Sequence, residues 1–370
     1  MSKKKIVIIG ANDFQNQLIL KAKEKGMETH VFAWKDGAVG EKTADYFYPI
    51  SIIEKEQILK VCEEIQPDGV ISIASDLAAI TVNYVAEKLG LTGNGIESSL
   101  VATNKYLMRK AFAKNSDPSP KFYRSDELTN EIIEQLHLPV IVKPVDRSGS
   151  RGINKIEDKK ELSMAIKAAE EVSFEHRAVI EEFVEGQEYS VEYISYRGKH
   201  TFLALTKKYT TGAPHFIETG HIEPAPIDNA TLEKVQEIVT HALDTLQIKN
   251  GASHSEIKIK DDGEIKIIEI GGRMGGDCIG SDLVKISTGY DFVEMVIDVA
   301  CGNEPRFEKV CIPAEAEIHF IFGENDMKAL EEIKQKNPEM IYRISEIEPF
   351  DEHEVVDSST RYGYYITRKE

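Results

Sequence analysis

The first hundred residues alternate short apolar runs with segments of helical spacing, and this alternation constrains the fold more than any other feature. The apolar runs occupy residues 5–9, 28–32 and 69–73. The helical segments, recognised by apolar residues at i, i+3 and i+4, occupy residues 14–25, 54–65 and 76–89. Strands that are joined by helices pair in parallel, because the chain must cross over to start the next strand in the same direction. Residues 1–102 are therefore predicted to form a doubly wound parallel α/β domain.

Gly10 ends the first apolar run, at the position where a dinucleotide-binding fold carries a Gly-x-Gly-x-x-Gly turn. Asn12 and Gln15 stand where that fingerprint requires glycine. A nicotinamide-dependent enzyme is therefore poorly supported, and the first β-α unit is interpreted as scaffold.

The charge balance limits the classes of partner. The 370 residues include 45 Lys and Arg against 63 Asp and Glu, a formal net charge of −18. Such a surface repels phosphate backbones and anionic lipids, so nucleic acid and membranes are not expected partners. Four cysteines are widely spaced without a Cys-x-x-Cys pair, which favours a reducing cytoplasm over disulfides or structural zinc.

A boundary between subdomains is predicted at Asn115-Ser-Asp-Pro-Ser-Pro120, because neither a helix nor a strand tolerates this composition. Beyond it, a strand at 140–143 brings Lys143 to a loop that contains Ser148, Gly149, Ser150 and Gly152. Glycine N–H groups, serine hydroxyls and a lysine ammonium are donors that suit a polyphosphate. An exposed turn with solvated charges fits the same residues equally well.

The next segment of interest connects two predicted strands and reads Glu181, Glu182, Phe183, Val184, with Glu188 shortly after. The backbone of such a linker can pair with a planar heterocycle while Phe183 and Val184 cover its faces. A carboxylate there could accept hydrogen bonds from ribose hydroxyls. A solvated strand edge with one buried side is the more common explanation of this pattern.

The sharpest argument concerns a predicted hairpin, residues 252–259 and 264–270, with a two-residue turn at Asp262-Gly263. This turn places Glu256 opposite Glu269. Opposed residues in an antiparallel pair have Cβ atoms about 5 Å apart, and two like charges there need neutralisation. Mg²⁺ takes one or two carboxylates together with phosphate oxygens and water. An exposed hairpin with splayed carboxylates is the alternative.

Directly after Glu269, the run Ile270-Gly-Gly-Arg273-Met-Gly-Gly-Asp277 holds four glycines within six residues, so the strand must end in a sharp turn. Arg273 on this loop can hold a phosphoryl or carboxylate group through its planar guanidinium. A structural arginine that balances the two glutamates is the competing interpretation, although it does not explain the glycines.

The order of these motifs resembles that of the ATP-grasp superfamily. The motifs are Lys105, Lys143 with its Gly/Ser loop, the segment from Glu181 to Glu188, and Glu256 with Glu269-Ile-Gly-Gly-Arg273. The resemblance spans most of the chain. Its last motif looks most like the branch of amino-acid and dipeptide ligases. It implies an ATP-grasp fold in which a Rossmann-like N-terminal domain precedes α+β ATP-binding subdomains.

The resemblance also implies roles for individual residues. It assigns Lys105 and Lys143 to the ATP phosphates, with Lys143 and Arg273 in catalysis, and residues 148–152 to a lid over the phosphates. It assigns Glu181, Glu182, Phe183 and Val184 to the adenine linker and Glu188 to the ribose. Glu256 and Glu269 would bind one or two Mg²⁺ ions, with Mn²⁺ as an alternative ion. Arg273, His254 and Gly276 would contact the substrate.

One position departs from the family pattern. Many family members carry Asn two residues after the second metal carboxylate, usually as a further ligand, and this chain has Gly271. The number of metal ions is therefore open. Residues before Pro224 are further candidates for the substrate pocket, without support from their spacing: Lys207, Lys208, His215, Glu218 and His221.

The expected domains are 1–102, the ATP-grasp domain at 103–303 with a lid at about 117–185, and a mixed α/β tail at 304–370 that packs on the core. The expected function is a cytoplasmic ligase that forms an acyl phosphate from a carboxylate with Mg-ATP and then an amide with an amine. A bicarbonate-activating carboxylase of purine or biotin type and a non-catalytic ATP-binding module are the alternatives. The expected partners are these small molecules, and a homodimer is compatible with the resemblance.

Overall fold

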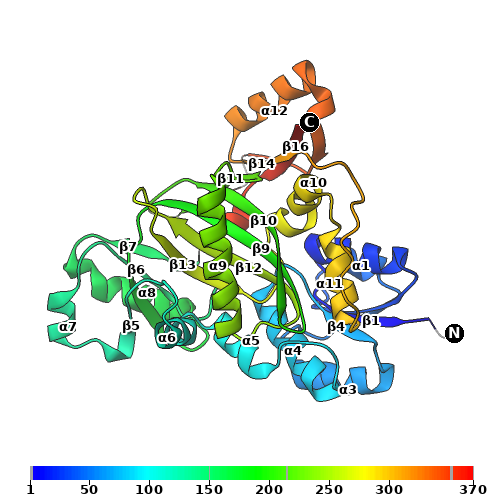
Figure 1. Cartoon of the computed structure of the whole chain (residues 1–370), viewed down its shortest axis with the longest axis horizontal. Coiled ribbons are helices and arrows are strands. Elements are labelled where there is room, and N and C mark those ends of the chain that lie inside the picture. Colours follow the sequence, from blue (N-terminus) through cyan, green and yellow to red (C-terminus); the bar gives the residue numbers. More distant parts are fainter. Residues whose placement is uncertain (1–2, 150, 214–215, 351–352, 370) are drawn as a thin grey trace.

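The structure is a computed structural model of the chain and describes residues 3–149, 151–213, 216–350 and 353–369. The fold contains three sheets, one in an N-terminal unit, one in a small lid unit and one central sheet. Figure 1 shows the central sheet in the middle, with the lid unit on the left and the N-terminal unit at the lower right. Ser150 and His215, both named from the sequence, lie outside the described residues.

The N-terminal unit is a parallel four-stranded sheet in the order β3-β2-β1-β4. Its strands are β1 (Lys5–Ile9), β2 (Glu28–Phe32), β3 (Tyr46–Tyr48) and β4 (Gly69–Ile71). Its helices are α1 (Asp13–Glu24), α2 (Val39–Thr43), α3 (Lys55–Ile65), α4 (Asp76–Leu89) and α5 (Ile96–Thr103). The predicted doubly wound parallel fold is confirmed here.

The lid unit is an antiparallel four-stranded sheet in the order β5-β8-β6-β7. Its elements are α6 (Lys105–Asn115), β5 (Phe122–Arg124), α7 (Asn130–Gln135), β6 (Val140–Pro144), β7 (Asn154–Ile156), α8 (Leu162–Val172) and β8 (Ala178–Glu182), with 3₁₀ turns at Ser125–Glu127 and Lys159–Glu161. Helix α8 packs its apolar face on the sheet through Leu162, Ala165 and Ala169. The loop between β6 and β7 faces the central sheet, because its residues 147–149 and 153 line a cavity together with residues of that sheet.

The central sheet has eight strands in the order β13-β12-β9-β10-β11-β14-β16-β15. Its strands are β9 (Gln187–Tyr196), β10 (Lys199–Thr210), β11 (Glu218–Glu223), β12 (Gly251–Ile259), β13 (Ile265–Gly271), β14 (Glu315–Ile321), β15 (Ile341–Ile344) and β16 (Gly363–Lys369). The predicted tail at 304–370 supplies three of these strands. The tail therefore continues the sheet that carries the predicted metal carboxylates.

Helices cover the central sheet and join it to the other units. These are α9 (Asn229–Thr245), a π-helical turn at Ile279–Leu283, α10 (Val284–Thr288), α11 (Phe292–Ala300) and α12 (Glu324–Lys336), with 3₁₀ turns at Pro338–Met340 and Ser358–Thr360. Helix α9 contacts β10 and β13. Its apolar residues, which include Val235, Val239 and Leu243, share one hydrophobic cluster with residues of β9 and β12, and Figure 1 shows the helix across the sheet.

Helix α11 fixes the N-terminal unit against the central sheet. All of its residues except Glu294 are buried, and it contacts both β4 and β12. The contact is close, because a Cβ added to Gly69 on β4 would lie 2.7 Å from the carbonyl oxygen of Ala300. Residues at the C-terminal ends of β1 and β4 are thereby held at a set distance from β12 and β13.

Glu223, at the end of β11, is a fully buried acid in the central sheet. It accepts hydrogen bonds of 2.5 Å from the hydroxyls of Thr206 on β10 and Ser287 on α10. Burial raises its pKa from 4.5 to about 7, against the smaller opposite effect of the two hydroxyls. The folded chain therefore keeps this proton over a pH range in which the unfolded chain has lost it.

Replacement of Glu223 by glutamine is expected to stabilise the protein at high pH. Wild-type stability falls as pH rises from 4.5 to about 7, because the unfolded state alone releases the proton in that window. The gain of Glu223→Gln over wild type should grow from near zero at pH 4.5 to at most about 3 kcal/mol above pH 7. Urea unfolding at pH 5 and pH 8 measures it, with the exposed Glu237→Gln on α9 as control. A gain that is equal at both pH values would contradict the assignment.

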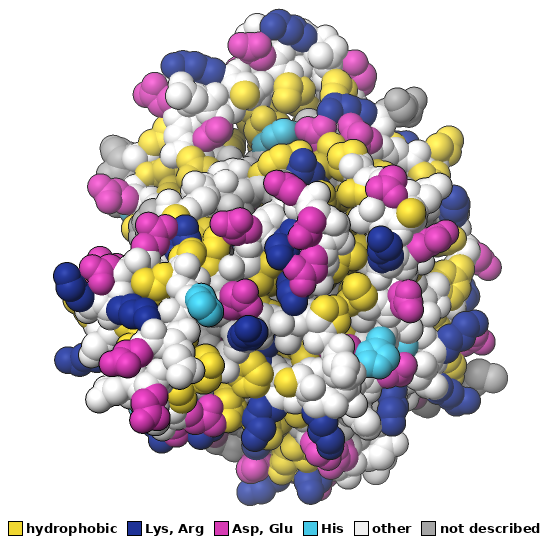
Figure 2. All heavy atoms as spheres, turned by 60° about the vertical axis from the view of Figure 1, so that its left-hand side comes forward, with side chains coloured by type: hydrophobic (Ala, Val, Ile, Leu, Met, Phe, Trp, Pro, Cys, Tyr) yellow, Lys and Arg dark blue, Asp and Glu magenta, His cyan; other side chains and the backbone are white. Residues whose placement is uncertain are grey.

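The described part of the chain holds no helix that is both long and apolar enough to cross a membrane. Figure 2 shows acidic and basic side chains interspersed over the face that it draws.

Candidate functional site

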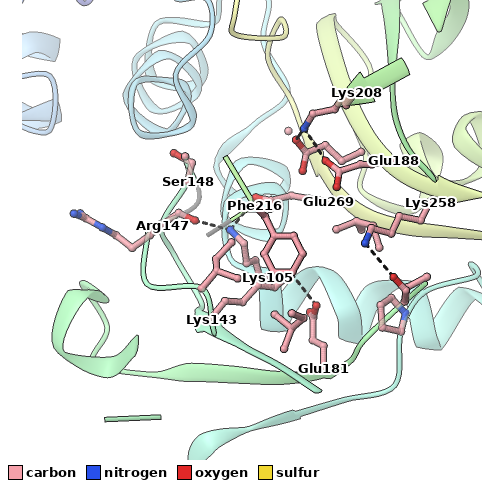
Figure 3. A pocket seen from close by; sticks show the side chains of 18 of the residues that line it. Lys105, Lys143, Arg147, Ser148, Glu181, Glu188, Lys208, Phe216, Lys258 and Glu269 are labelled. Atoms are coloured by element: carbon pink, nitrogen blue, oxygen red, sulfur yellow. Dashed lines mark hydrogen bonds and ion pairs between the residues drawn. The ribbon is translucent and has the colours of Figure 1, made fainter. Parts of the chain in front are cut away.

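One cavity collects most of the side chains singled out in the sequence. It lies where the lid unit faces the central sheet, and Figure 3 shows it from close by. Its lining includes these predicted residues: Lys105, Lys143, Ser148, Gly149, Glu181, Glu182, Phe183, Val184, Glu188, His254, Glu256, Glu269 and Arg273. Gly276 is not among the lining residues. We refer to this space as the nucleotide cavity.

Lys143 is held on β6 by a buried ion-pair cluster. Its Nζ lies 2.8 Å from an oxygen of Glu181 on the neighbouring strand β8. The other Glu181 oxygen lies 2.9 Å from Nε of Arg109 on α6, and all three residues are at most 4% exposed. Burial acts to raise the pKa of Glu181, but Arg109 and Lys143 outweigh it and lower that pKa. The Glu181 carboxylate thus positions Lys143, a use that differs from the predicted place of Glu181 in the adenine linker.

The hairpin differs from its prediction in two ways that cancel. The turn has three residues, Asp261 to Gly263, because the N–H of Lys260 donates to the carbonyl of Glu264 at 2.9 Å, and Gly263 adopts a φ of 83°. Ile257 then pairs with Ile267, but Glu256 pairs with Glu269. Ile268 is the extra residue of a β-bulge, which shifts the register back. The predicted two-residue turn is wrong, whereas the predicted opposition of Glu256 and Glu269 is confirmed.

Each of these carboxylates is neutralised by a buried lysine. Glu256 accepts from Lys208 Nζ at 2.7 Å and Glu269 accepts from Lys105 Nζ at 2.9 Å. Lys208 also lies 2.8 Å from Glu188. Burial would lower the pKa of Lys208, but Glu188, Glu256 and Glu218 outweigh it and raise that pKa well above its usual value.

The sequence offers Lys208 only as a candidate for the substrate pocket, and its place between Glu188 and Glu256 was not predicted. The available signal was the alternation along β10, where Ala204, Thr206 and Lys208 share one face. The structure shows that face to be buried. A lysine on a buried strand face needs acidic partners, and these are Glu188 and Glu256.

The two carboxylates suit a divalent ion that takes part of its shell from elsewhere. Their side chains are 26% and 24% exposed to the cavity, and the lysines engage one oxygen of each. No group of three metal-ligating side chains is found among the described residues. An ion held by Glu256 and Glu269 would need phosphate oxygens and water as further ligands, which is usual for Mg²⁺ at nucleotide sites.

Two phenylalanine rings line one end of the cavity. Phe183 and Phe216 have ring centroids 6.3 Å apart, and Lys258 Nζ lies 4.9 Å from the Phe183 centroid and donates to the carbonyl of Val184 at 3.0 Å. The N–H of Phe183 is already used, because it donates to the carbonyl of Pro139 at 3.2 Å. Phe216 and Lys258 were missed in the sequence, where nothing links them to the segment at 181–184. This end suits a flat, weakly polar ring system.

Residues 136–282 match the family model of the ATP-grasp domain. The chain contains an ATP-grasp domain. The match contains every predicted site residue except Lys105.

Two kinds of relative accompany this match. An alanine–anticapsin ligase of Bacillus subtilis (strain 168) is 29% identical over 270 residues, which cover 66% of this chain and 56% of that protein. The chain thus spans little more than half the length of this curated relative. The crystal structure of an L-amino acid ligase from Bacillus licheniformis superposes with a TM-score of 0.80 at 25% identity and covers 100% of this chain and 94% of that one.

A phosphoribosylglycinamide synthetase from Anaerococcus prevotii has the same fold, with a TM-score of 0.78 at 22% identity over 100% of this chain and 95% of that one. The predicted ATP-grasp fold with its Rossmann-like N-terminal domain is confirmed.

Gly271, the departure from the usual ATP-grasp pattern, has a steric explanation. A Cβ added there would lie 2.8 Å from Oδ1 of Asp76. Asp76, the first residue of α4, reaches over from the N-terminal unit and forms a bidentate pair with Arg273, at 2.8 Å to Nε and 3.1 Å to Nη2. The space of the usual asparagine side chain is therefore occupied by Asp76 in this ATP-grasp protein.

The pairing leaves one edge of the Arg273 guanidinium available. Nε and Nη2 donate to Asp76, and Nη1 donates to the carbonyl of Met274 at 3.2 Å. Each Nη atom carries a second hydrogen, so the edge between Nη1 and Nη2 can still donate two hydrogen bonds. Burial acts to raise the pKa of Asp76, but Arg273 outweighs it and lowers that pKa. Arg273 is therefore rigidly held and can present a two-pronged donor to an oxyanion.

His254 faces the same region with a fully buried partner. Its Nδ1 is hydrogen-bonded to Glu192 on β9, and the other Glu192 oxygen accepts from the N–H of Gly275 at 3.0 Å. His254 Nε2 lies 3.6 Å from a Glu256 oxygen. Burial would lower the pKa of His254, but Glu192 outweighs it and raises that pKa to about 9. Glu192, absent from the predictions, ties the glycine loop to β9.

The C-terminal tail also reaches the glycine loop. Arg361 forms a bidentate pair with Asp277, which directly follows Gly276, and its guanidinium carbon lies 3.6 Å from the Phe320 ring centroid. Asp277 and Cys278 both adopt positive φ, 51° and 61°, so the chain turns sharply here. The two partners are 84 positions apart in the sequence, so no local pattern indicates this contact.

Proposed function

We propose that this ATP-grasp protein is a carboxylate–amine ligase that uses Mg-ATP to form an acyl phosphate and then an amide. The observation that carries the proposal is the opposition of Glu256 and Glu269, each paired with a buried lysine. Lys143 and Arg273 line the same cavity. The names of the sequence relative and the structural neighbour, both amino-acid ligases, support the choice of reaction.

In the first step, an oxygen of the substrate carboxylate attacks the γ-phosphorus, the bond to the β–γ bridging oxygen breaks, and ADP leaves. Lys143, Lys105 and Lys208 neutralise the charge of the phosphate oxygens, and Arg273 offers its Nη1–Nη2 edge to the acyl phosphate. Mg²⁺ bound by Glu256 and Glu269 would supply further positive charge to the phosphates. Phe183, Val184 and Phe216 are placed to hold the adenine, and Glu188 the ribose.

In the second step, the amine nitrogen attacks the acyl carbon, the bond from that carbon to the phosphate oxygen breaks, and phosphate leaves. The nitrogen gives up one proton. Water competes with the amine for the acyl phosphate and must be excluded. The loop that includes Ser148 and Gly149 is proposed as the lid. Gly276 remains a proposed substrate contact by its position next to Gly275.

The proposal extends to the setting of the reaction. Mn²⁺ could replace Mg²⁺, because both accept oxygen ligands. All four cysteines are free thiols, which supports a reducing compartment such as the cytoplasm. A homodimer remains a prediction.

The test is release of ADP and phosphate from Mg-ATP in the presence of pooled amino acids and other carboxylates, followed by mass identification of the product. A ligase is expected to release one ADP for each amide formed, and neither the acid nor the amine alone should sustain this rate. Stimulation by bicarbonate and by no carboxylate pool would favour the carboxylase alternative. Silence in every pool with intact ATP binding would favour a non-catalytic module.

A further inference from the structure

A second cavity, of about 390 Å³, lies between the N-terminal unit and the loop that follows β6. Helices α4 and α5 form one wall, and residues 146–148, 151 and 174–175 form the other. Lys105, Arg147, Ser148 and Glu269 line both this space and the nucleotide cavity. We call it the α4–α5 cavity. Its volume is within the roughly 300–1,000 Å³ of small-molecule sites, and a molecule there borders the proposed phosphate and metal residues.

The walls of the α4–α5 cavity are largely apolar. Ile53, Leu100 and Phe174 line it and remain 51%, 49% and 59% exposed, although side chains of this size are usually buried. Leu77 and Ile80 on α4 add to the same wall. Large apolar side chains that surround a concave space mark a ligand-binding site. The ligand is therefore expected to have an apolar body.

Most acidic groups on the walls already have partners. Asp76 pairs with Arg273 and Glu269 with Lys105. Asp146 accepts from the N–H of Glu175 at 2.8 Å, and Glu175 in turn accepts from Asn104.

Arg147 differs from these paired acidic groups, and it lines the cavity together with two other cations, Lys55 and Arg151. Its guanidinium stacks on Phe174, with 4.3 Å from Cζ to the ring centroid. Its buried Nε has no hydrogen-bond acceptor among the described residues. Figure 3 shows this side chain directed away from Lys105, Lys143 and Glu181. A buried cationic donor without a hydrogen-bond partner costs folding free energy, so we expect an anionic group of a ligand to pair with Arg147.

We infer that the α4–α5 cavity binds the amine substrate as an amino acid with an apolar side chain, whose carboxylate pairs with Arg147. The inference rests on the proposed ligase function. The amino group of such a substrate attacks the acyl carbon, phosphate leaves, and the nitrogen loses a proton. Its carboxylate takes no part in these bond changes, so it needs a counter-ion that persists through the reaction. A planar guanidinium matches a carboxylate through two parallel hydrogen bonds.

The test is isothermal titration of leucine, methionine and phenylalanine, and of their carboxamides, into the protein saturated with Mg-ADP. Each carboxamide keeps the side chain and the amino group but lacks the carboxylate. At least one amino acid is expected to bind the wild type about 10-fold or more tightly than its carboxamide, as the strength of a charge-assisted hydrogen bond implies. Arg147→Gln should abolish this preference by weakening amino-acid binding alone. Arg177→Gln, elsewhere on the lid unit, is the matched control and should retain it.

Two further measurements keep the inference falsifiable. Ile80→Phe, which fills the cavity, should weaken the amino acid and its carboxamide alike, whereas Leu20→Phe on the exposed face of α1 should change neither. If Arg147→Gln weakens a non-hydrolysable ATP analogue and spares the amino acid, Arg147 is a phosphate ligand and the inference is wrong. It is also wrong if the wild type binds none of the three amino acids.

The result separates this inference from the proposed function. ADP release with pooled substrates, without binding of apolar amino acids, would overturn the cavity assignment and leave the ligase intact. Carboxylate-dependent binding that Arg147→Gln abolishes, without ADP release in any pool, would establish the site and overturn the ligase.

Discussion

Replacement of Glu269 by glutamine is expected to lower the rate of ATP-dependent ADP release by about 10²–10³-fold, the usual cost of losing one electrostatic contact to a transition state. Glutamine keeps the size of the side chain on β13 but removes the charge that would hold Mg²⁺ opposite Glu256. It also removes the counter-ion of Lys105, 2.9 Å away. Steady-state ADP release at a series of Mg²⁺ concentrations measures the effect, and high Mg²⁺ should partly restore the rate.

A double-mutant cycle sharpens this prediction. If Glu256 and Glu269 hold the same ion, Glu256→Gln should cost a similar factor, and the double variant should lose little more than either single variant. Glu264→Gln is the matched control, because Glu264 sits at the exposed turn of the same hairpin and pairs only with Lys260 and Lys266. Losses that multiply in the double variant, or an unchanged Mg²⁺ dependence, would contradict a shared metal site.

The fold could largely be predicted because its signals are local. Strands β1 and β2 and helix α4 have the predicted limits, and helices α1 and α3 differ by one residue at their ends. Each is bounded by a change in periodicity or by turn residues, which the sequence displays directly. The eight-stranded order was not predicted, because pairing of β11 with β14 joins segments about a hundred residues apart.

The site residues that were predicted also belong to local sequence motifs. The spacing of these motifs identifies Lys143, Glu256, Glu269 and Arg273. The β-bulge at Ile268 could not be predicted, because an apolar residue there is compatible with either register. The pairing of Glu256 with Glu269 was predicted correctly only because the longer turn and the bulge shift the register in opposite directions.

The contacts that sequence reasoning missed join residues that are far apart in the sequence. Asp76, Glu192 and Arg361 were not predicted, and Lys208 was predicted only as a pocket candidate. These four residues approach the site from four different segments, and their charged partners are brought close by the fold. From the sequence alone, a single charged residue is most simply interpreted as exposed to solvent. Its partner depends on the tertiary structure, which the spacing of residues along the sequence does not indicate.

Asp76 gives the second large expected effect. Asp76→Ala removes both hydrogen bonds that orient the Arg273 guanidinium, and should lower kcat about 10–100-fold, because misplacement of a catalytic group by about 1 Å can cost 10² in rate. The KM for ATP should change little, since Asp76 does not line the nucleotide cavity. Asp13→Ala is the control: Asp13 is likewise the first residue of a helix, α1, so it matches any effect on the helix dipole.

The steric relation between Asp76 and Gly271 makes this prediction specific. Gly271→Asn alone should impair activity at least as much, because its Cβ would lie 2.8 Å from Asp76 Oδ1 and push that carboxylate off Arg273. Combined with Asp76→Ala, the same asparagine has room, and its amide can occupy the place where other ATP-grasp proteins carry one. The double variant should therefore be more active than Gly271→Asn, a reversal that only a shared space explains. Additive losses would show that Asp76 supports the fold of α4 and leaves Arg273 unaffected.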